Sequence, residues 1–174
     1  MRVLVTAASK HGATREIAEA ICERLVAAGL HGWVADPDNV ETLDSADAVV
    51  LGSGVYAGHW LEPAKALVER FEYSLRERPV WLFSSGPVGD PPMPRETAGE
   101  VGEIERATGA RSHEVFAGRI DKELLGFGER ALVRALRVPE GDYRDWDAIA
   151  RWADQIAAAL APATATTTEG GDPP

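Results

Sequence analysis

The stretch RVLVTAASKHGAT at residues 2–14 decides the fold of this chain. It opens with a short run of apolar and small residues, typical of a strand that is buried on both faces. It ends in small and hydroxyl residues that lead directly into helical spacing over residues 13–28, with Gly29 as a helix stop. A buried strand, a short loop and a helix in that order form the first unit of an α/β sheet.

Outward from this stretch, the alternation of strand and helix patterns recurs along the chain. Short apolar runs predict further strands at residues 31–36, 48–51, 80–83 and 113–118. Spacings of three and four predict helices at residues 61–75, 94–108 and 146–160, the last with Asp145 as its N-cap. This alternation implies an α/β protein with a parallel sheet and helices on both faces.

The length of 174 residues allows one domain with a sizeable core, which we assign to residues 1–160. Residues 119–141 are an insertion between the fifth strand and the last helix. Residues 161–174 are rich in Ala, Thr, Pro and Gly, so they are predicted to form a disordered tail. The insertion is expected to contain a helix with the apolar residues Leu124, Leu125, Phe127, Leu132 and Leu136.

The net charge of −10 argues against nucleic acid or anionic lipid as a partner, because both call for a basic face. It fits an acidic protein that meets basic partners. Cys22 is the single cysteine, so no internal disulfide is expected, and its place in a helical pattern predicts a buried or half-buried thiol. The sequence has no apolar run of transmembrane length and no secretory leader, so we expect a cytoplasmic protein.

Ligands of open parallel α/β sheets bind beyond the carboxyl ends of the strands, where the loop from Ser9 to Thr14 is expected to lie. Small and hydroxyl residues before a helix N-terminus can wrap an anion, although an ordinary helix cap would look the same. The dinucleotide fingerprint and the triphosphate loop are both absent, because Gly12 is the only glycine of this loop and no Gly-Lys-Ser/Thr follows. The acidic residues of a phosphorylated receiver domain are absent too.

The pattern Ser9-x-His11-Gly12-x-Thr14 resembles the phosphate loop of flavodoxins, which usually reads Ser/Thr-x-Thr-Gly-x-Thr. The resemblance covers about residues 2–160 and implies a flavodoxin-like, doubly wound, five-stranded parallel sheet in the order 2-1-3-4-5. It also implies flavin mononucleotide (FMN) as cofactor, with its phosphate held by Ser9, His11, Gly12, Ala13 and Thr14. His11 departs from the usual threonine of that position.

Two further loops resemble the flavin-ring loops of that family. In the first, Tyr56 occupies the place of an aromatic residue that stacks on the ring, although core packing is an alternative for both Tyr56 and Trp60. The second has no aromatic residue, which suggests that one ring face is open to a partner or substrate. The ring-loop residues are Ser53, Gly54, Val55, Tyr56, Ala57 and Gly58 in the first loop and Ser84, Ser85, Gly86 and Pro87 in the second.

The chain looks most similar to the flavodoxin subgroup that includes menaquinone-dependent protoporphyrinogen oxidase. Shared features are the Gly58-His59 pair before an aromatic residue, the Asp145-Trp146 pair that opens the last helix, and an insertion after the fifth strand. The resemblance implies electron flow from a porphyrinogen through FMN to a quinone. The insertion there is long and basic, whereas here it is shorter and of mixed charge.

The sequence is consistent with three functions. The first is an FMN-dependent oxidoreductase, in which no side chain need act as a nucleophile and His59 is a candidate proton donor or a surface histidine. The second is an electron carrier that passes single electrons between protein partners. The third is a module that has lost FMN. His31 and His113 fall at strand starts, away from the site edge, and no metal site is predicted. The apolar residues of the insertion are expected to pack close to the open flavin face or across a homodimer contact, or else to form a small satellite core beneath the insertion.

Overall fold

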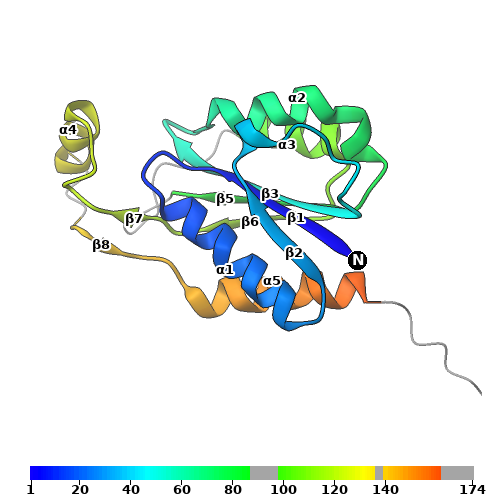
Figure 1. Ribbon diagram of the computed structural model, residues 1–174. Helices are drawn as coiled ribbons and strands as arrows, with labels where there is room; N and C mark the ends of the chain where they lie inside the picture. Colours follow the sequence, from blue (N-terminus) through cyan, green and yellow to red (C-terminus); the bar gives the residue numbers. More distant parts are fainter. Residues whose placement is uncertain (87–97, 136–138, 162–174) are drawn as a thin grey trace, which may run out of the picture.

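The computed structural model describes residues 1–86, 98–135 and 139–161. The strands of its main sheet are β1 (Arg2–Ala8), β2 (His31–Ala35), β3 (Ala48–Tyr56), β4 (His59–Trp60), β5 (Val80–Ser85) and β6 (His113–Phe116). The helices that cover it are α1 (Ala13–Ala27), α2 (Glu62–Arg76), α3 (Ala98–Thr108) and α5 (Trp146–Leu160), and a 3-10 turn, η1, spans Pro37–Asn39. Figure 1 shows α1 and α5 on one face of the sheet and α2 and α3 on the other.

The predicted α/β class, with a parallel sheet between two helical layers, is confirmed. The five parallel strands lie in the order β2-β1-β3-β5-β6, which is similar to the predicted order but not identical. The difference is β4, a strand that we did not predict and that pairs antiparallel with β3 through Val55↔Trp60 and Tyr56↔His59. Its two-residue turn has positive φ at both Ala57 (51°) and Gly58 (85°), as hairpin turns require, but alanine rarely adopts that conformation.

The predicted end of the third strand at Leu51 is wrong, because β3 continues through Gly52 to Tyr56. A Cβ atom at Gly52 would lie 2.1 Å from Cζ of Phe83, so the phenyl ring of the neighbouring strand occupies that space. Glycine therefore serves close packing here and does not break the strand. The longer strand carries Tyr56 to the carboxyl-end edge of the sheet.

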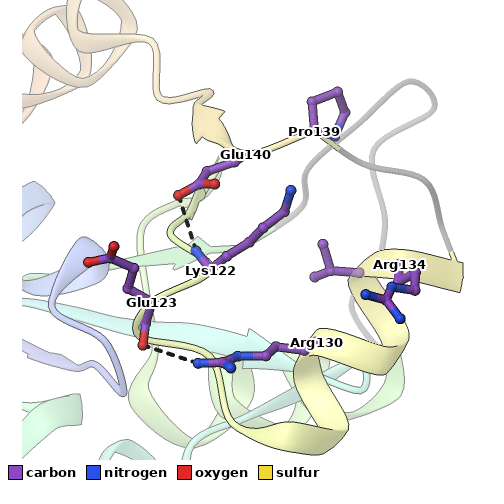
Figure 2. Close-up of a pocket in the computed structure, with 7 residues that line it drawn as sticks. Lys122, Glu123, Arg130, Arg134, Pro139 and Glu140 are labelled. Atoms are coloured by element: carbon purple, nitrogen blue, oxygen red, sulfur yellow. Dashed lines mark hydrogen bonds between the residues drawn. The ribbon is translucent and has the colours of Figure 1, made fainter.

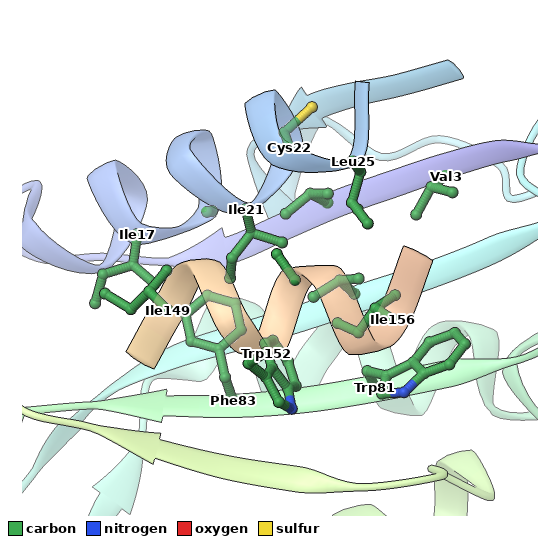
Figure 3. Close-up of a cluster of buried hydrophobic side chains, with 14 of the residues drawn as sticks. Val3, Ile17, Ile21, Cys22, Leu25, Trp81, Phe83, Ile149, Trp152 and Ile156 are labelled. Carbon is green, nitrogen blue, oxygen red and sulfur yellow. The ribbon is translucent and has the colours of Figure 1, made fainter. Parts of the chain in front are cut away.

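One half of the core lies between the sheet and the pair α1 and α5 (Figure 3). Isoleucines of both helices meet over Phe83 of β5, as the periodicity of the two helices predicts. Cys22 is buried in this layer as predicted, and burial raises the pKa of its thiol. At the exposed side of the layer, Arg24 of α1 forms a bidentate ion pair with Asp154 of α5, with N–O distances of 2.7 and 2.9 Å.

The insertion forms a two-stranded ribbon and a helix of its own. β7 (Arg119–Ile120) pairs antiparallel with β8 (Gly141–Asp142), and α4 spans Phe127–Ala135. Figure 1 shows this unit projecting beyond the carboxyl ends of the parallel strands, with α4 standing apart from the two helical layers. The predicted helix is observed, but it begins at Phe127, so Leu124 and Leu125 precede it. Phe127 is 94% exposed and Leu124 is 47% exposed, so neither fills a core under the insertion.

Parts of four predictions fall outside the described residues: Pro87 of the second ring loop, the start of the helix predicted at 94–108, Leu136 of the insertion helix, and the tail beyond residue 161. From residue 98 onward that helix is present as α3. The N-cap role of Asp145 is confirmed, since its Oδ1 atom accepts a hydrogen bond of 2.9 Å from the backbone N–H of Ala148. Among the described helices, none is both long and apolar enough to cross a bilayer.

Candidate functional site

The loop from Ser9 to Thr14 connects the carboxyl end of β1 to the first turn of α1. Gly12 is the N-cap residue and adopts a left-handed conformation (φ 85°, ψ −22°), which glycine reaches without strain. Glycine has no side chain with which to accept hydrogen bonds from the first N–H groups of the helix, unlike Asp145 at the start of α5. The N-terminal end of α1 therefore lacks a side-chain cap, an arrangement that suits an external acceptor such as a phosphate.

Ser9 gives a second indication that this loop receives a ligand. Its Oγ atom is buried and has no hydrogen-bond partner within the protein. A buried hydroxyl without a partner is unfavourable by about 1–3 kcal/mol, so such groups in native sites usually bind something else. Thr14, the other hydroxyl residue of the loop, is also buried. The loop thus offers hydroxyl groups and helix N–H groups within one short segment.

The first ring loop lies against the phosphate loop. The ring centroid of Tyr56, at the end of β3, lies 6.2 Å from that of His11 in an edge-on arrangement. The Nζ atom of Lys10 lies 5.2 Å from the same tyrosine centroid, a contact that we did not predict. A Cβ atom at Gly54 would lie 3.2 Å from Oγ1 of Thr14, so the two loops approach closely there too. The predicted phosphate-loop and ring-loop residues are therefore brought together.

The second ring loop contacts both the first ring loop and the insertion through Gly86. Gly86 has φ 149°, and a Cβ atom added to it would lie 3.0 Å from the carbonyl oxygen of Val55. Its N–H donates to the carbonyl oxygen of Phe116 at 3.3 Å. A Cβ atom at Gly118 would lie 3.0 Å from Cα of Gly86, so the chain that enters the insertion passes directly over this loop.

Two of the predicted site serines point their hydroxyl groups into the protein. Ser53 Oγ donates to the carbonyl oxygen of Gly54 and accepts from the N–H of Leu61, both at 2.9 Å. Ser84 Oγ accepts from the indole Nε1–H of Trp60 at 2.8 Å. Both serines are fully buried, so their hydroxyl groups stabilise the ring loops through hydrogen bonds within the protein. Trp60 is itself buried, which confirms the core-packing interpretation of that residue.

His113 is the residue that sequence reasoning set aside and the structure brings to the site. Its Nε2 atom lies 2.8 Å from Oγ of Ser84, directly beneath the second ring loop. The register of β5 and β6 pairs Leu82 with His113, and the imidazole reaches forward from there to Ser84. Burial lowers the pKa of His113 below its ordinary value, although the charge of Glu105 opposes this effect. A single sequence carries no signal for that register.

His59 lies on the hairpin between β3 and α2, where its side chain is exposed. Its Nδ1 atom is 3.5 Å from Oε2 of Glu100, the same atom that accepts a hydrogen bond from the N–H of Trp60. This position beside the first ring loop is compatible with either of the two interpretations made from the sequence. Its role as a proton donor stays a prediction.

A comparison with protein families resolves which α/β protein this is. The model of the flavodoxin domain matches residues 4–147, which include the phosphate loop and both ring loops. The chain belongs to the flavodoxin domain family. No curated protein sequence matches it significantly.

Solved structures agree with this assignment at the level of the fold. Flavodoxin 1 from Bacillus cereus is 14% identical, with a TM-score of 0.64, and the match covers 92% of this chain and 100% of that one. A cysteine-to-serine mutant of flavodoxin from Pseudomonas aeruginosa is 17% identical, with a TM-score of 0.62 and coverages of 92% and 99%. Rubredoxin oxygen:oxidoreductase from Desulfovibrio gigas is 15% identical, with a TM-score of 0.60 and coverages of 91% and 36%.

FMN is the cofactor of this flavodoxin domain, as its family membership implies. The residues present fit the cofactor. The unpartnered Oγ atom of Ser9 and the uncapped N-terminus of α1 suit a phosphate, and Tyr56 supplies an aromatic ring beside them. When bound, the flavin supplies the redox chemistry, while the protein supplies binding, orientation and electrostatics.

Proposed function

We propose that this flavodoxin domain is an FMN-dependent oxidoreductase that passes electrons to a quinone-type acceptor. Residues Ser9 to Thr14 hold the phosphate, Tyr56 stacks on one face of the flavin ring, and the second ring loop borders its other face. A porphyrinogen-type donor is the substrate class that the subgroup resemblance suggests. His59, an exposed side chain beside the first ring loop, is the proposed proton donor at this edge.

The observation that carries this proposal is the contact between Gly118 and Gly86. It places the start of the insertion over a ring loop whose described residues, Ser84 to Gly86, include no aromatic side chain. A flavin face left uncovered by an aromatic ring is accessible to a flat reactant. An insertion that begins at that face is in a position to shape the access of a small planar molecule.

The alternative is a carrier of single electrons between proteins, and the net charge of −10 favours it. An acidic surface attracts a basic redox partner and accelerates its encounter, in a manner that weakens with salt. The two functions differ in the electron acceptors that they serve. A carrier needs a stable one-electron-reduced flavin, whereas a two-electron oxidoreductase does not.

The deciding experiment combines photoreduction of the FMN-loaded chain with reoxidation by two acceptors. We expect fast reoxidation by the soluble quinone menadione, slow reoxidation by cytochrome c, and little accumulation of one-electron-reduced flavin in absorbance spectra. A stable one-electron state with transfer to cytochrome c alone would favour the carrier. A colourless protein that fails to quench FMN fluorescence would favour the module that has lost FMN.

The stacking role of Tyr56 is tested in parallel with a matched pair of variants. Tyr56→Leu should raise the dissociation constant of FMN about three- to tenfold, the range expected when an offset aromatic pair is lost. Tyr73→Leu is the control, because Tyr73 lies on α2 and is 77% exposed. Equal FMN affinity of the two variants would show that the ring binds elsewhere.

A further inference from the structure

Arg144 is a buried arginine between β8 and α5 whose role the function above does not use. Its side chain is only 2% exposed. Its Nε and Nη2 atoms donate to the two carboxylate oxygens of Asp142 at 2.8 and 2.6 Å. Its Nη1 atom donates to the carbonyl oxygen of Ala13 at 3.0 Å and lies 2.8 Å from Oε2 of Glu16. One guanidinium therefore links the ribbon of the insertion to the first turn of α1.

Glu16 is the acidic member of this cluster that lies closest in sequence to the phosphate loop. Arg119 of β7 adds a second cation, with Nη1 2.9 Å from each oxygen of the Glu16 carboxylate. Burial alone would raise the pKa of Glu16, but the hydrogen bonds and charges of Arg144 and Arg119 outweigh that effect and lower it. Hydrogen bonding to Arg144 is the main reason that the pKa of Asp142 is also lowered.

The contacts of Arg144 with Ala13 and Glu16 lie in the first turn of α1, next to the phosphate loop. Ala13 directly precedes Thr14 and Glu16 follows it by two residues, and Ala13 is the first residue of the helix whose N-terminus would face the phosphate. A carboxylate in that first turn would repel a phosphate, unless cations neutralise it. Arg144 and Arg119 do so, and Arg144 also fixes the Ala13 peptide by its carbonyl oxygen. An ion pair that served stability alone, such as Arg24–Asp154 farther along α1, makes no contact of this kind.

We propose that Arg144 is a positioning residue for the FMN phosphate: it holds the Ala13 peptide in place and neutralises Glu16 next to the phosphate loop. The inference rests on the proposed placement of the phosphate at Ser9 to Thr14. Its effect is exerted on a phosphate and not on a flavin ring. Substitution of Arg144 should therefore weaken the binding of FMN but not that of riboflavin, which differs from FMN only by lacking the phosphate.

The test measures dissociation constants of FMN and riboflavin for the full chain by fluorescence quenching. Arg144→Met should raise the value for FMN about ten- to a hundredfold, the range of a lost charge-assisted hydrogen bond, and leave that for riboflavin nearly unchanged. Adding Glu16→Gln should restore part of the FMN affinity, because it removes the repelling carboxylate. Arg24→Ala is the matched control, since it breaks a bidentate pair at the far end of α1, and it should change neither constant.

The variants are expected to fold, because the Glu16 and Asp142 side chains that lose their partner are each 40% exposed and can be hydrated. Arg144→Lys keeps the charge without the fork and serves if Arg144→Met unfolds. Equal losses for FMN and riboflavin, or no loss for either, in the folded variant would overturn the proposal. Failure of the phosphate site itself is recognised separately: Ser9→Ala would then leave the ratio of FMN to riboflavin affinity unaltered.

Discussion

The Nε2 atom of His113 lies 2.8 Å from the hydroxyl oxygen of Ser84, which in turn accepts a hydrogen bond from the indole of Trp60. Since Trp60 donates to Ser84, the serine proton can be donated to the imidazole, and a neutral His113 accepts it. Burial also lowers the pKa of His113, because the charged imidazolium is poorly hydrated there. An uncharged His113 can therefore complete the support beneath the second ring loop.

The lowered pKa of His113 predicts that the protein loses stability in mild acid. The folded-state pKa of His113 is lower than the unfolded-state value, so the unfolded chain takes up the proton first as the pH falls. The contribution is complete above the unfolded value of about 6.5 and declines below it, until the lowered folded pKa is reached. Urea unfolding at about pH 7.5 and pH 5.5 should show this decline in the wild type and a smaller one in His113→Gln.

His31→Gln is the matched control, because His31 lies exposed at the start of β2. It should retain the full decline between the two pH values. Four described carboxylates have a lowered pKa: Glu16, Asp47, Asp142 and Asp154. The stabilisation that they contribute is lost in a separate and more acidic window, as the pH falls below their ordinary values. An identical pH dependence in the wild type and in His113→Gln would show that folding does not lower the pKa of His113.

The phosphate loop is tested by a pair of glycines with the same conformation at opposite ends of α1. Gly12 and Gly29 have φ of 85° and 88°, and nothing lies within 4 Å of an added Cβ at either one. Gly12→Val and Gly29→Val should therefore be strained alike, by about 1–2 kcal/mol. Only Gly12→Val should weaken FMN, because its side chain obstructs the approach of the phosphate to the backbone. If the two variants are folded, have similar stability in urea and bind FMN with equal affinity, the phosphate lies elsewhere.

Thr14 is expected to contribute a hydroxyl donor to the same phosphate. Thr14→Ala should weaken FMN by roughly 1.5–3 kcal/mol, the value of a hydrogen bond to a charged acceptor. Thr14→Ser retains the hydroxyl group and should lose much less. Titration of each variant with FMN and riboflavin distinguishes the roles, because only a phosphate contact affects FMN selectively. Similar losses for Thr14→Ala and Thr14→Ser would show that the methyl group matters, through packing of this buried residue.

The close approach of the insertion to the second ring loop is tested at Gly118. Gly118→Ala would press a Cβ atom to within 3.0 Å of backbone Cα of Gly86, which cannot move as easily as a side chain. We expect a loss of about 1–3 kcal/mol in unfolding free energy, with weaker FMN binding. Gly102→Ala in α3 is the control: its Cβ meets nothing within 4 Å, so the variant should be more stable, by about 0.5–1 kcal/mol. Urea unfolding without FMN measures both.

The parts of the fold that local patterns determine could be predicted from the sequence. The apolar run of β1, the periodicity of α1 and the N-cap at Asp145 all lie within a few residues of the features that reveal them. β4 could not be predicted, because its turn places Ala57 at a positive φ. Nor could the passage of β3 through Gly52, since that depends on the ring of Phe83 in another strand.

The candidate site divides in the same way. Ser9, Gly12 and Thr14 form a contiguous pattern that a resemblance can detect. The contact of Arg144 with Ala13 joins residues 131 positions apart, and that of His113 with Ser84 joins residues 29 apart. Such contacts depend on strand register and on the path of the insertion, which one sequence does not encode in any local pattern. The sequence therefore predicts the loops of the candidate site but not the residues that support them, Arg144 and His113.

The exposed apolar side chains of the insertion lead to a prediction about function. Leu124 and Phe127 are exposed residues of the insertion, and neither belongs to the two core clusters of the described residues. The same segment carries a cavity of about 620 Å³ that Lys122, Arg130 and Arg134 line (Figure 2). We expect this segment to shape substrate access to the flavin or to contact a second copy of the chain.

Replacing residues 122–137 with a short Gly-Ser linker tests that expectation. The linker leaves Arg119, Asp142 and Arg144 in place, together with all three ligand loops, so FMN should bind with unchanged affinity. Turnover with menadione or the apparent mass in solution should change. Phe127→Ser narrows the cause, because it removes the most exposed apolar ring without shortening the chain, and Tyr73→Ser is its matched control on α2. If the deletion alters neither turnover nor mass, the insertion serves neither substrate access nor self-association, and its exposed residues have no part in the function proposed for the flavin site.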